Sequence, residues 1–273
     1  MNTQKRVCAI HDISCFGKCS LTVALPIISA GGIEVSVVPT AVLSTHTGGF
    51  LDYTYRDLTG DILPIINHWN SLNIHFDAVY SGYLGSFEQL EIVSEVFDRI
   101  KSKDTLIIVD PVMADNGKLY AGFSEGFPVG MRDLIGKADI IVPNMTEAAL
   151  LLGIPFQEGP YTEAYIEKIL KGMTELGPER VVLTGVYFDD SRLGAACLDT
   201  KNPKPRYIMS ERLDDNYHGT GDVFASTLVA AVLNGFDLSD AVTIAVEFTL
   251  GCIKRTKLSG NDVRYGVNFE EGL

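Results

Sequence analysis

The residues Gly219-Thr220-Gly221-Asp222 place an acidic side chain directly after a glycine-containing turn. Glycine lets backbone N–H groups converge on an anion, and a helix predicted over 222–234 would add the positive end of its dipole. A carboxylate at this point can accept a proton from an alcohol while the amides hold developing negative charge. The motif therefore indicates phosphoryl transfer to an alcohol. An aspartate that only caps the helix is the alternative.

Polar side chains also follow two apolar runs earlier in the chain. Asp110 ends the run 106–109, and Asn144 and Glu147 come just after the run 140–142. In open α/β sheets, ligands bind beyond the carboxyl ends of the parallel strands. We therefore expect these side chains to lie near the Gly-Thr-Gly-Asp motif. The structural alternative for Asp110 is an acid in a turn before proline. The alternative for Glu147 is a carboxylate in the first turn of a helix, where the helix dipole favours it.

Short β-branched runs alternate with longer amphipathic ones, a pattern typical of βαβ crossovers and of a parallel sheet covered on both faces. The runs 192–198 and 207–211 have no helix between them and predict an edge hairpin joined through the turn 199–205. We predict one α/β domain over 1–273, with three α/β/α layers and a mainly parallel central sheet. Strands are expected at 7–10, 35–39, 78–81, 106–110, 139–143 and 180–184, and helices at 21–30, 61–72, 87–101, 144–152, 163–176, 222–234 and 238–257.

Composition limits the kinds of partner. The chain has 273 residues and a formal net charge of -13, which argues against a nucleic-acid surface because phosphate backbones require basic patches. No apolar run reaches the ~20 residues of a membrane span. The five cysteines are dispersed, which indicates reduced thiols and a cytoplasmic protein. The polar tail 261–273 is expected to be poorly ordered.

Together these motifs resemble those of the pyridoxal/pyridoxamine kinases, the vitamin B6 branch of the ribokinase-like superfamily. The resemblance runs nearly end to end and implies a ribokinase-like fold. Gly-Thr-Gly-Asp is typical of the whole superfamily, whereas the segments 44–47 and 81–86 point to the B6 branch. The resemblance is carried by Gly17, Ser44-Thr45-His46-Thr47, Ser81-Gly82-Tyr83-Leu84-Gly85-Ser86, Asp110-Pro111-Val112-Met113, Pro143-Asn144 with Glu147, and Gly219-Thr220-Gly221-Asp222.

This resemblance implies ATP-dependent phosphorylation of the 5′-hydroxymethyl group of pyridoxal, pyridoxamine or pyridoxine. Asp222 would be the catalytic base, and the amides of residues 219–221 would form the anion hole, an electrostatic contribution that is usually large. Mg²⁺ would be held by Asp110, Asp115 and Glu147, directly or through water, because this ion prefers oxygen ligands and keeps several waters. Contacts with ATP are expected from Asn144, Thr184 and Thr220.

The resemblance also implies which side chains meet the vitamin. His46 and Thr47 would hydrogen-bond its ring nitrogen and phenolic oxygen, and Tyr83 would stack on its ring. Alternatively, His46 is a loop histidine whose ring hydrogen-bonds only backbone groups, and Tyr83 is simply a half-buried aromatic residue. Many pyridoxal kinases have a serine where this chain has Asp12. Asp12 could accept a hydrogen bond from a protonated ring nitrogen or an amine, or it could simply cap the next helix.

Other activities remain open on the same sequence. A hydroxymethylpyrimidine (phosphate) kinase of thiamine synthesis is the alternative enzyme, and a catalytically silent nucleotide or vitamin sensor is an alternative from another class. The intact base motif argues against the sensor. The kinship implies a homodimer and leaves open the preferred vitamer and an activating monovalent cation. The polar run 214–216 is a candidate part of a lid over ATP, and Cys15 and Cys19 have no assigned role.

Overall fold

The computed structural model describes residues 4–213 and 217–273, and the candidate lid run 214–216 lies outside them. Two strands of the described residues form a separate short hairpin, and nine others form one large sheet. From one edge to the other, its order is β11 (Asn202–Glu211), β10 (Arg192–Asp199), β9 (Arg180–Asp189), β8 (Ile140–Ile141), β5 (Leu106–Val109), β4 (Ala78–Ser81), β1 (Arg6–Ser14), β2 (Glu34–Leu43) and β3 (Tyr55–Asp57).

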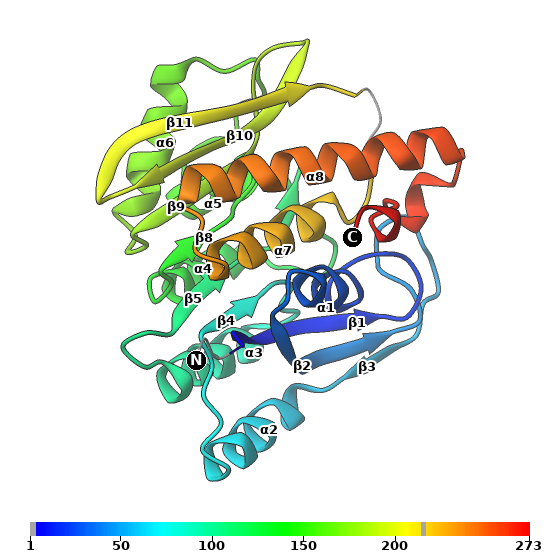
Figure 1. Ribbon diagram of the computed structural model, residues 1–273, viewed down its shortest axis with the longest axis vertical. Helices are drawn as coiled ribbons and strands as arrows, with labels where there is room; N and C mark the ends of the chain where they lie inside the picture. The colour runs from blue at the N-terminus through cyan, green and yellow to red at the C-terminus, as the bar shows by residue number, and fades with distance from the viewer. Residues whose placement is uncertain (1–3, 214–216) are drawn as a thin grey trace.

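Helices cover both faces of this sheet, so the predicted three-layer α/β/α architecture is confirmed (Figure 1). None of the helices within the described residues combines the length and the apolar character that crossing a membrane requires. One face carries α1 (Leu21–Ala30), α7 (Thr220–Leu233) and α8 (Leu238–Ser259), and the other carries α2 (Thr59–Ser71), α3 (Phe87–Ile100), α4 (Phe127–Ile135), α5 (Met145–Leu152) and α6 (Glu163–Thr174).

The sheet is mainly parallel, as predicted, since every neighbouring pair from β9 to β2 is parallel. The edge hairpin of β10 and β11 is antiparallel, also as predicted. Its turn is shorter than the predicted 199–205, because Asp199 already pairs with Asn202. Pro203 and Pro205 are tolerated within β11 because an edge strand leaves one side of its backbone without a neighbour.

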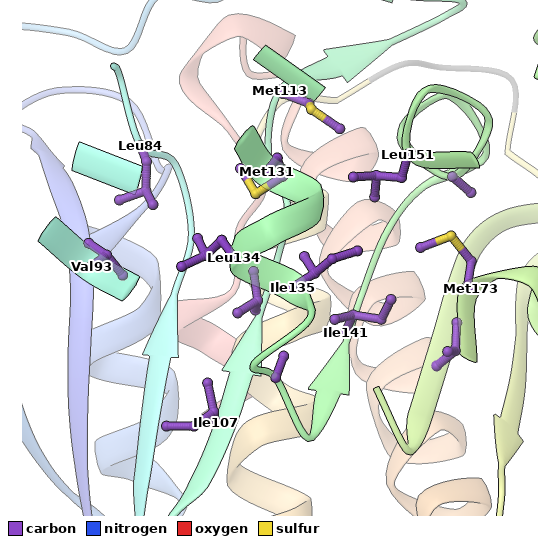
Figure 2. Close-up of a cluster of buried hydrophobic side chains, with 14 of the residues drawn as sticks. Leu84, Val93, Ile107, Met113, Met131, Leu134, Ile135, Ile141, Leu151 and Met173 are labelled. Atoms are coloured by element: carbon purple, nitrogen blue, oxygen red, sulfur yellow. The ribbon is translucent and has the colours of Figure 1, made fainter. Parts of the chain in front are cut away.

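Alternation of side chains along the strands divides the interior into two cores. In β1, Cys8 and Ile10 pack toward the α2–α6 face, whereas Val7 packs toward α1, α7 and α8. Figure 2 shows the first of these cores, where Ile107 and Ile141 of the sheet lie beside side chains of α4 and α5. The helix α4 was not predicted from the sequence. Its short apolar stripe, which includes Met131, Leu134 and Ile135, supplies part of the layer that covers this face.

The helix α7 is buried on almost all sides. Every side chain from Val223 to Leu233 is buried, a pattern typical of a helix enclosed by other elements rather than lying at the surface. Its neighbours are α1 and α8, which pack against it on the same face of the sheet. The start of α7 is therefore held in place by the core, which fixes where Asp222 points.

The prediction of a poorly ordered tail is wrong. Val267 is 0% exposed and Phe269 is 2% exposed, and both pack with Val23 of α1 and Cys252 of α8. Two short 3₁₀ helices, Val263–Tyr265 and Glu270–Gly272, flank these anchors. Polar composition did not prevent order here because two separated apolar side chains dock the segment and hydrogen bonds of Asn268 add to this contact.

Candidate active site

The carboxyl ends of the central strands bring several predicted residues to one edge of the sheet. Asp12 lies near the end of β1, and Asp110 follows β5, where its N–H donates to the carbonyl of Ser81 at 2.9 Å. Asn144, just beyond β8, forms a parallel bridge with Thr184, which lies within β9 because this strand continues to Asp189, past the predicted end at 184. The expected convergence at the strand ends is therefore present.

The glycine motif forms a compact turn against the loop that follows β1. Gly219 has φ +75°, and a Cβ placed on it would lie 2.0 Å from the carbonyl oxygen of Lys18. The residue thus needs glycine for both its conformation and its space. Gly219 caps α7 without a side-chain hydrogen bond to the first-turn amides. The N–H groups of Thr220 and Gly221 are consequently in position to serve an anion.

Asp222 lies in the first turn of α7, half-buried beside this turn. Loss of water contact raises the pKa of its carboxyl group to about 7, and the negative charge of Asp12 adds to this increase. A backbone N–H of Ser20 hydrogen-bonds the carboxylate and opposes the shift. A carboxylate with a pKa near neutrality is matched to work as a general base.

Asp110 and Glu147 form a buried acidic pair near Asp222. They are 6% and 3% exposed. Burial raises the pKa of Asp110 well above its ordinary value, and the charges of Glu147 and Asp222 raise it further. Burial likewise raises the pKa of Glu147 to about 8, although backbone N–H groups, including that of Asn144, lower it in part. Two buried acids without a cation favour protonated forms, so the pair would fit a divalent cation.

Asn144 and Glu147 also build the start of α5. The Asn144 Oδ1 accepts hydrogen bonds from the N–H groups of Thr146 at 2.8 Å and Glu147 at 2.9 Å. In return, Glu147 Oε2 accepts from the Asn144 N–H at 2.9 Å, which completes a capping box. The Asn144 Nδ2 donates to the carbonyl of Ala114 at 2.8 Å. Both side chains therefore have structural partners in addition to any ligand role.

Asp115 lies apart from this buried pair. It is exposed in β6 (Ala114–Asp115), which pairs with β7 (Lys118–Leu119), and its carboxylate accepts from the N–H of Asn116 at 2.8 Å. Its charge still raises the pKa of Glu147. Over residues 4–213 and 217–273, no three acidic, histidine or cysteine side chains converge into a metal-binding cluster. Mg²⁺ would therefore rely on waters and phosphate oxygens for most of its ligands.

Two of the residues predicted to meet the vitamin lie near each other, Asp12 near the end of β1 and Tyr83 just after the neighbouring strand β4. Asp12 is 4% exposed, and its Oδ2 accepts from the hydroxyl of Ser14 at 3.2 Å. Tyr83 is half-buried beside Phe123, with 5.6 Å between ring centroids. Asp12 and Tyr83 lie close enough that the acid contributes to a Tyr83 pKa of about 12, after burial and the Tyr55 hydroxyl. Thr47 is exposed on the loop after β2.

His46 is placed differently from its predicted role. Its Nε2 bonds the carbonyl oxygen of Arg264 at 2.6 Å, and its Nδ1 accepts from the N–H of Gly48 at 3.1 Å. Because a carbonyl can only accept, the hydrogen of the ring is on Nε2. Both ring nitrogens are thus engaged by backbone groups, which corresponds to the structural alternative for this residue.

Two further residues lie near the acids, Tyr120, which sequence reasoning missed, and Cys19, to which it gave no role. Burial raises the pKa of Tyr120, and so do the charges of Glu147, Asp115, Asp110 and Asp222, which places its hydroxyl among all of these carboxylates. Tyr120 follows the β6–β7 hairpin, whose turn residues Asn116 and Gly117 have φ +50° and +76°. This Asn-Gly pair is the sequence signal that could have predicted the hairpin. Cys19, which had no assigned role, lies near Asp222 and Asp12, and burial together with their charges keeps its thiol pKa well above its usual value.

Known proteins place the chain in a family. The model of the family described as phosphomethylpyrimidine kinase matches residues 32–268. The chain belongs to this family. A pyridoxine/pyridoxal/pyridoxamine kinase from Bordetella avium is 28% identical over 266 residues, which cover 93% of this chain and 86% of that protein.

Solved structures agree with this placement. The pyridoxal kinase from Lactobacillus plantarum is 32% identical, has a TM-score of 0.90, and aligns over 98% of this chain and 95% of its own. A Bacteroides thetaiotaomicron protein, provisionally named a phosphomethylpyrimidine kinase and crystallised with pyridoxal, is 36% identical with a TM-score of 0.94. That alignment covers 98% of this chain and 94% of the Bacteroides chain. The resemblance to pyridoxal kinases of the ribokinase-like superfamily is confirmed.

Substitution of Asp110 tests whether its burial beside other acids lowers the stability of the folded protein as the pH rises. An acid with a raised folded pKa makes folding weaken as pH rises from the unfolded pKa toward the folded one. Without divalent cations, the free energy of unfolding of the wild type should fall as the pH rises from 5 to 8. In Asp110→Asn this fall should be smaller by about 1 kcal/mol or more. Urea titrations at both pH values measure this. The exposed Asp104→Asn should follow wild type, and equal losses in all three proteins would contradict the assignment.

Substitution within the glycine turn separates its chemistry from its folding. A Cβ on Gly221 meets nothing within 4 Å, so Gly221→Ala should fold normally. The methyl group would occupy the space beside the first-turn amides, and we expect turnover to fall about 100-fold. Gly60→Ala in α2 is the matched control, since Gly60 also has open space around it. Retained turnover in Gly221→Ala with an unchanged melting temperature would remove these amides from the mechanism.

Proposed function

We propose that this protein transfers the γ-phosphoryl group of ATP to the 5′-hydroxymethyl group of pyridoxal, pyridoxamine or pyridoxine. The observation that carries the proposal is Asp222, an acid with a pKa of about 7 directly after a glycine turn and near the buried Asp110. Pyridoxal kinases among its relatives support the same activity. The Bacteroides neighbour crystallised with pyridoxal supports a vitamin-sized substrate.

The chain's own groups divide the work of the reaction. Asp222 accepts the proton of the substrate hydroxyl, because its carboxyl is ionised in a large fraction of molecules at neutral pH. The N–H groups of residues 219–221 hydrogen-bond the phosphoryl group as it moves and stabilise its charge. Burial of α7 keeps these amides and Asp222 in one fixed arrangement.

Asp110 and Glu147 would hold Mg²⁺, directly or through its bound waters, beside the phosphate groups of ATP. The ion supplies positive charge that neutralises phosphate oxygens. Asp115, which is exposed on β6, would act through water. Thr184 and Thr220 would contact phosphate groups, and Asn144 would position the start of α5 for the same nucleotide. Since Asn144 has its amide committed to backbone partners, its role toward ATP is to shape the site.

Asp12, Tyr83 and Thr47 would set the choice of vitamer. Burial raises the pKa of Asp12, while hydrogen bonds from Ser20 and Ser14 lower it. A cationic amine or ring nitrogen would favour its ionised form, which points to pyridoxamine. Phosphomethylpyrimidine kinase, the description of the matching family model, is the second candidate, but the named relatives favour B6 vitamers.

We propose further that the protein is a cytoplasmic homodimer. Its cysteines are all free thiols, and Cys8, Cys197 and Cys252 are buried. Thiols without disulfide partners are typical of a reducing compartment. The homodimer is proposed from kinship alone, and analytical ultracentrifugation of the purified chain would test it.

Loss of the base should remove turnover while leaving nucleotide binding intact. For Asp222→Asn we expect kcat to fall about 1,000-fold or more, with ATP affinity within a few-fold of wild type. In wild type, kcat/KM should rise with pH and level off above about 7, because the ionised form of Asp222 is the active one. Steady-state kinetics and calorimetry measure both. A wild-type profile without this limb, or unchanged turnover in Asp222→Asn, would disprove the mechanism.

Asp12→Ser tests the selection of substrate. The ratio of kcat/KM for pyridoxamine to that for pyridoxal should fall about 10-fold, because a charged hydrogen bond to the amine is lost. Asp12→Asn, which keeps the size of the side chain, should lower the ratio as well. Hydroxymethylpyrimidine belongs in the same panel. A wild-type preference for that alcohol over every B6 vitamer would favour the alternative kinase, and an unchanged ratio would remove Asp12 from vitamer choice.

A further inference from the structure

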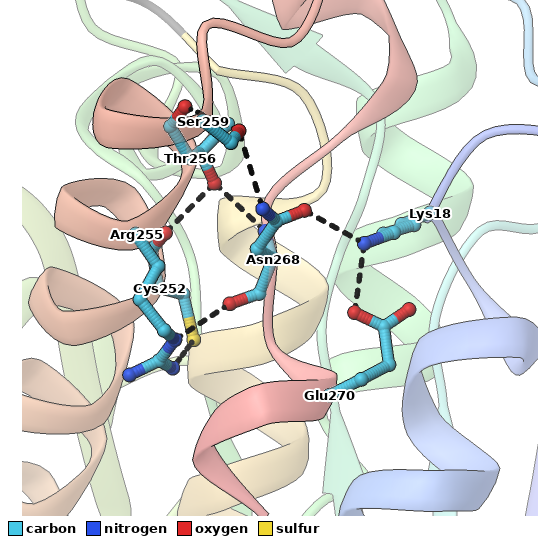
Figure 3. Close-up of polar contacts among 7 residues, drawn as sticks. All are labelled: Lys18, Cys252, Arg255, Thr256, Ser259, Asn268 and Glu270. Carbon is cyan, nitrogen blue, oxygen red and sulfur yellow. Dashed lines mark hydrogen bonds and ion pairs between the residues drawn. The ribbon is translucent and has the colours of Figure 1, made fainter.

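The C-terminal segment packs directly on the backbone of the loop after β1. The N–H of Lys18 donates to the carbonyl of Tyr265 at 3.1 Å. Its Nζ donates to Asn268 Oδ1 at 3.1 Å and to Glu270 Oε2 at 2.7 Å (Figure 3). Gly266 has φ +84°, and a Cβ placed on it would lie 2.7 Å from the Lys18 Cβ and 2.9 Å from its carbonyl oxygen. A larger residue at position 266 would force this segment or Lys18 to shift.

The same Lys18 carbonyl also contacts the glycine turn of the active site. A Cβ on Gly219 would lie 2.0 Å from that oxygen. Lys18 is therefore enclosed between Gly266 of the tail and Gly219 of the turn, with glycine required on both sides. A displacement of the tail would release the loop on which the turn rests.

Asn268 fixes the tail to α8 and to Lys18 at once (Figure 3). Its N–H donates to Thr256 Oγ1 at 2.7 Å, and its carbonyl accepts from Arg255 Nε at 3.0 Å. Its Nδ2 donates to Ser259 Oγ at 3.3 Å, while its Oδ1 takes the bond from Lys18. Because every polar group of Asn268 is used, the position of Lys18 is tied to the end of a long, well-packed helix.

His46 provides a second connection from the tail to the site. Its Nε2 donates to Arg264 and its Nδ1 accepts from Gly48, as described above. A Cβ on Gly17 would lie 2.2 Å from the His46 ring, so the ring fills the space beside the residue before Lys18. The ring of His218, which directly precedes the glycine turn, lies 5.2 Å from that of His46.

We propose that the C-terminal segment 264–270 positions the amide turn of the active site, with Lys18 and His46 as the positioning residues that connect them. This role rests on the phosphoryl-transfer function proposed above. The segment touches no atom that reacts. It determines where the N–H groups of Thr220 and Gly221 point, and so it should affect kcat more than the binding of either substrate.

Two glycine substitutions test this role. Gly266→Ala and Gly260→Ala both place a side chain at positive φ, at +84° and +65°, but only the first meets Lys18. In the full-length protein, Gly266→Ala should speed amide hydrogen exchange over 15–20 and 217–221 and lower kcat about 10-fold or more, with KM values less affected. Gly260→Ala should leave both regions and kcat close to wild type. Unchanged exchange in a folded Gly266→Ala protein would overturn the proposal.

A pair of His46 variants keeps the test decisive if Gly266→Ala does not fold. Glutamine places a donor where Nε2 lies and can still bond Arg264, whereas asparagine retains only the acceptor for Gly48. His46→Asn should therefore show faster exchange and at least about 5-fold lower kcat than His46→Gln. Equal behaviour of the two would contradict a connection through the tail. A wild-type protein that phosphorylates none of the vitamers would disprove the proposed function alone, because the exchange measurements do not depend on turnover.

Discussion

Withdrawal of the Asp222 carboxylate from water is the interaction on which the site depends. A pKa raised from 3.8 to about 7 corresponds to about 4 kcal/mol of preference for the protonated form. The fold can bear this penalty because α7 is buried along nearly its whole length and cannot turn its first residues outward. The N–H of Ser20 limits the shift and keeps the group able to ionise near neutral pH. Burial thus gives Asp222 the pKa that its proposed role as a base toward an alcohol requires.

The same edge of the sheet gathers other acids that disfavour one another. Asp110 and Glu147 are buried together, and Asp12 is buried beside Asp222. Backbone amides offset part of this repulsion, as in the capping box that holds Glu147. The remaining repulsion would be relieved by a bound cation, and the chain as a whole has a net charge of -13. Such an arrangement is suited to a ligand that arrives with its own cation, as nucleotides do.

Much of the fold could be predicted because hydrophobic periodicity is local. The bounds of α1, Leu21–Ala30, agree with the predicted helix, and α3 ends within one residue of its prediction. The helix α4 was missed because Phe127–Ile135 is short and contains proline and glycine. The tail was predicted wrongly because Val267 and Phe269 show no periodicity, and only the three-dimensional fold provides the surface that they cover.

Sequence motifs indicated the acids and glycines of the candidate site directly. They did not indicate the contacts that support these residues. His46 bonds a carbonyl 218 positions away in the chain, and no local pattern indicates such a partner. Tyr120 is placed among the acids by the β6–β7 hairpin, whose pairing spans only two residues on each side. The partner of His46 depends on tertiary structure, so sequence reasoning indicated the candidate reacting groups more readily than the contacts that support them.

The most direct measurement is the titration of the Asp222 carboxyl by ¹³C NMR in the free, full-length protein. Its resonance can be assigned by its disappearance in Asp222→Asn. If burial creates the base, the midpoint should lie near pH 7. A midpoint near pH 4, the ordinary range of an exposed aspartate, would contradict the account.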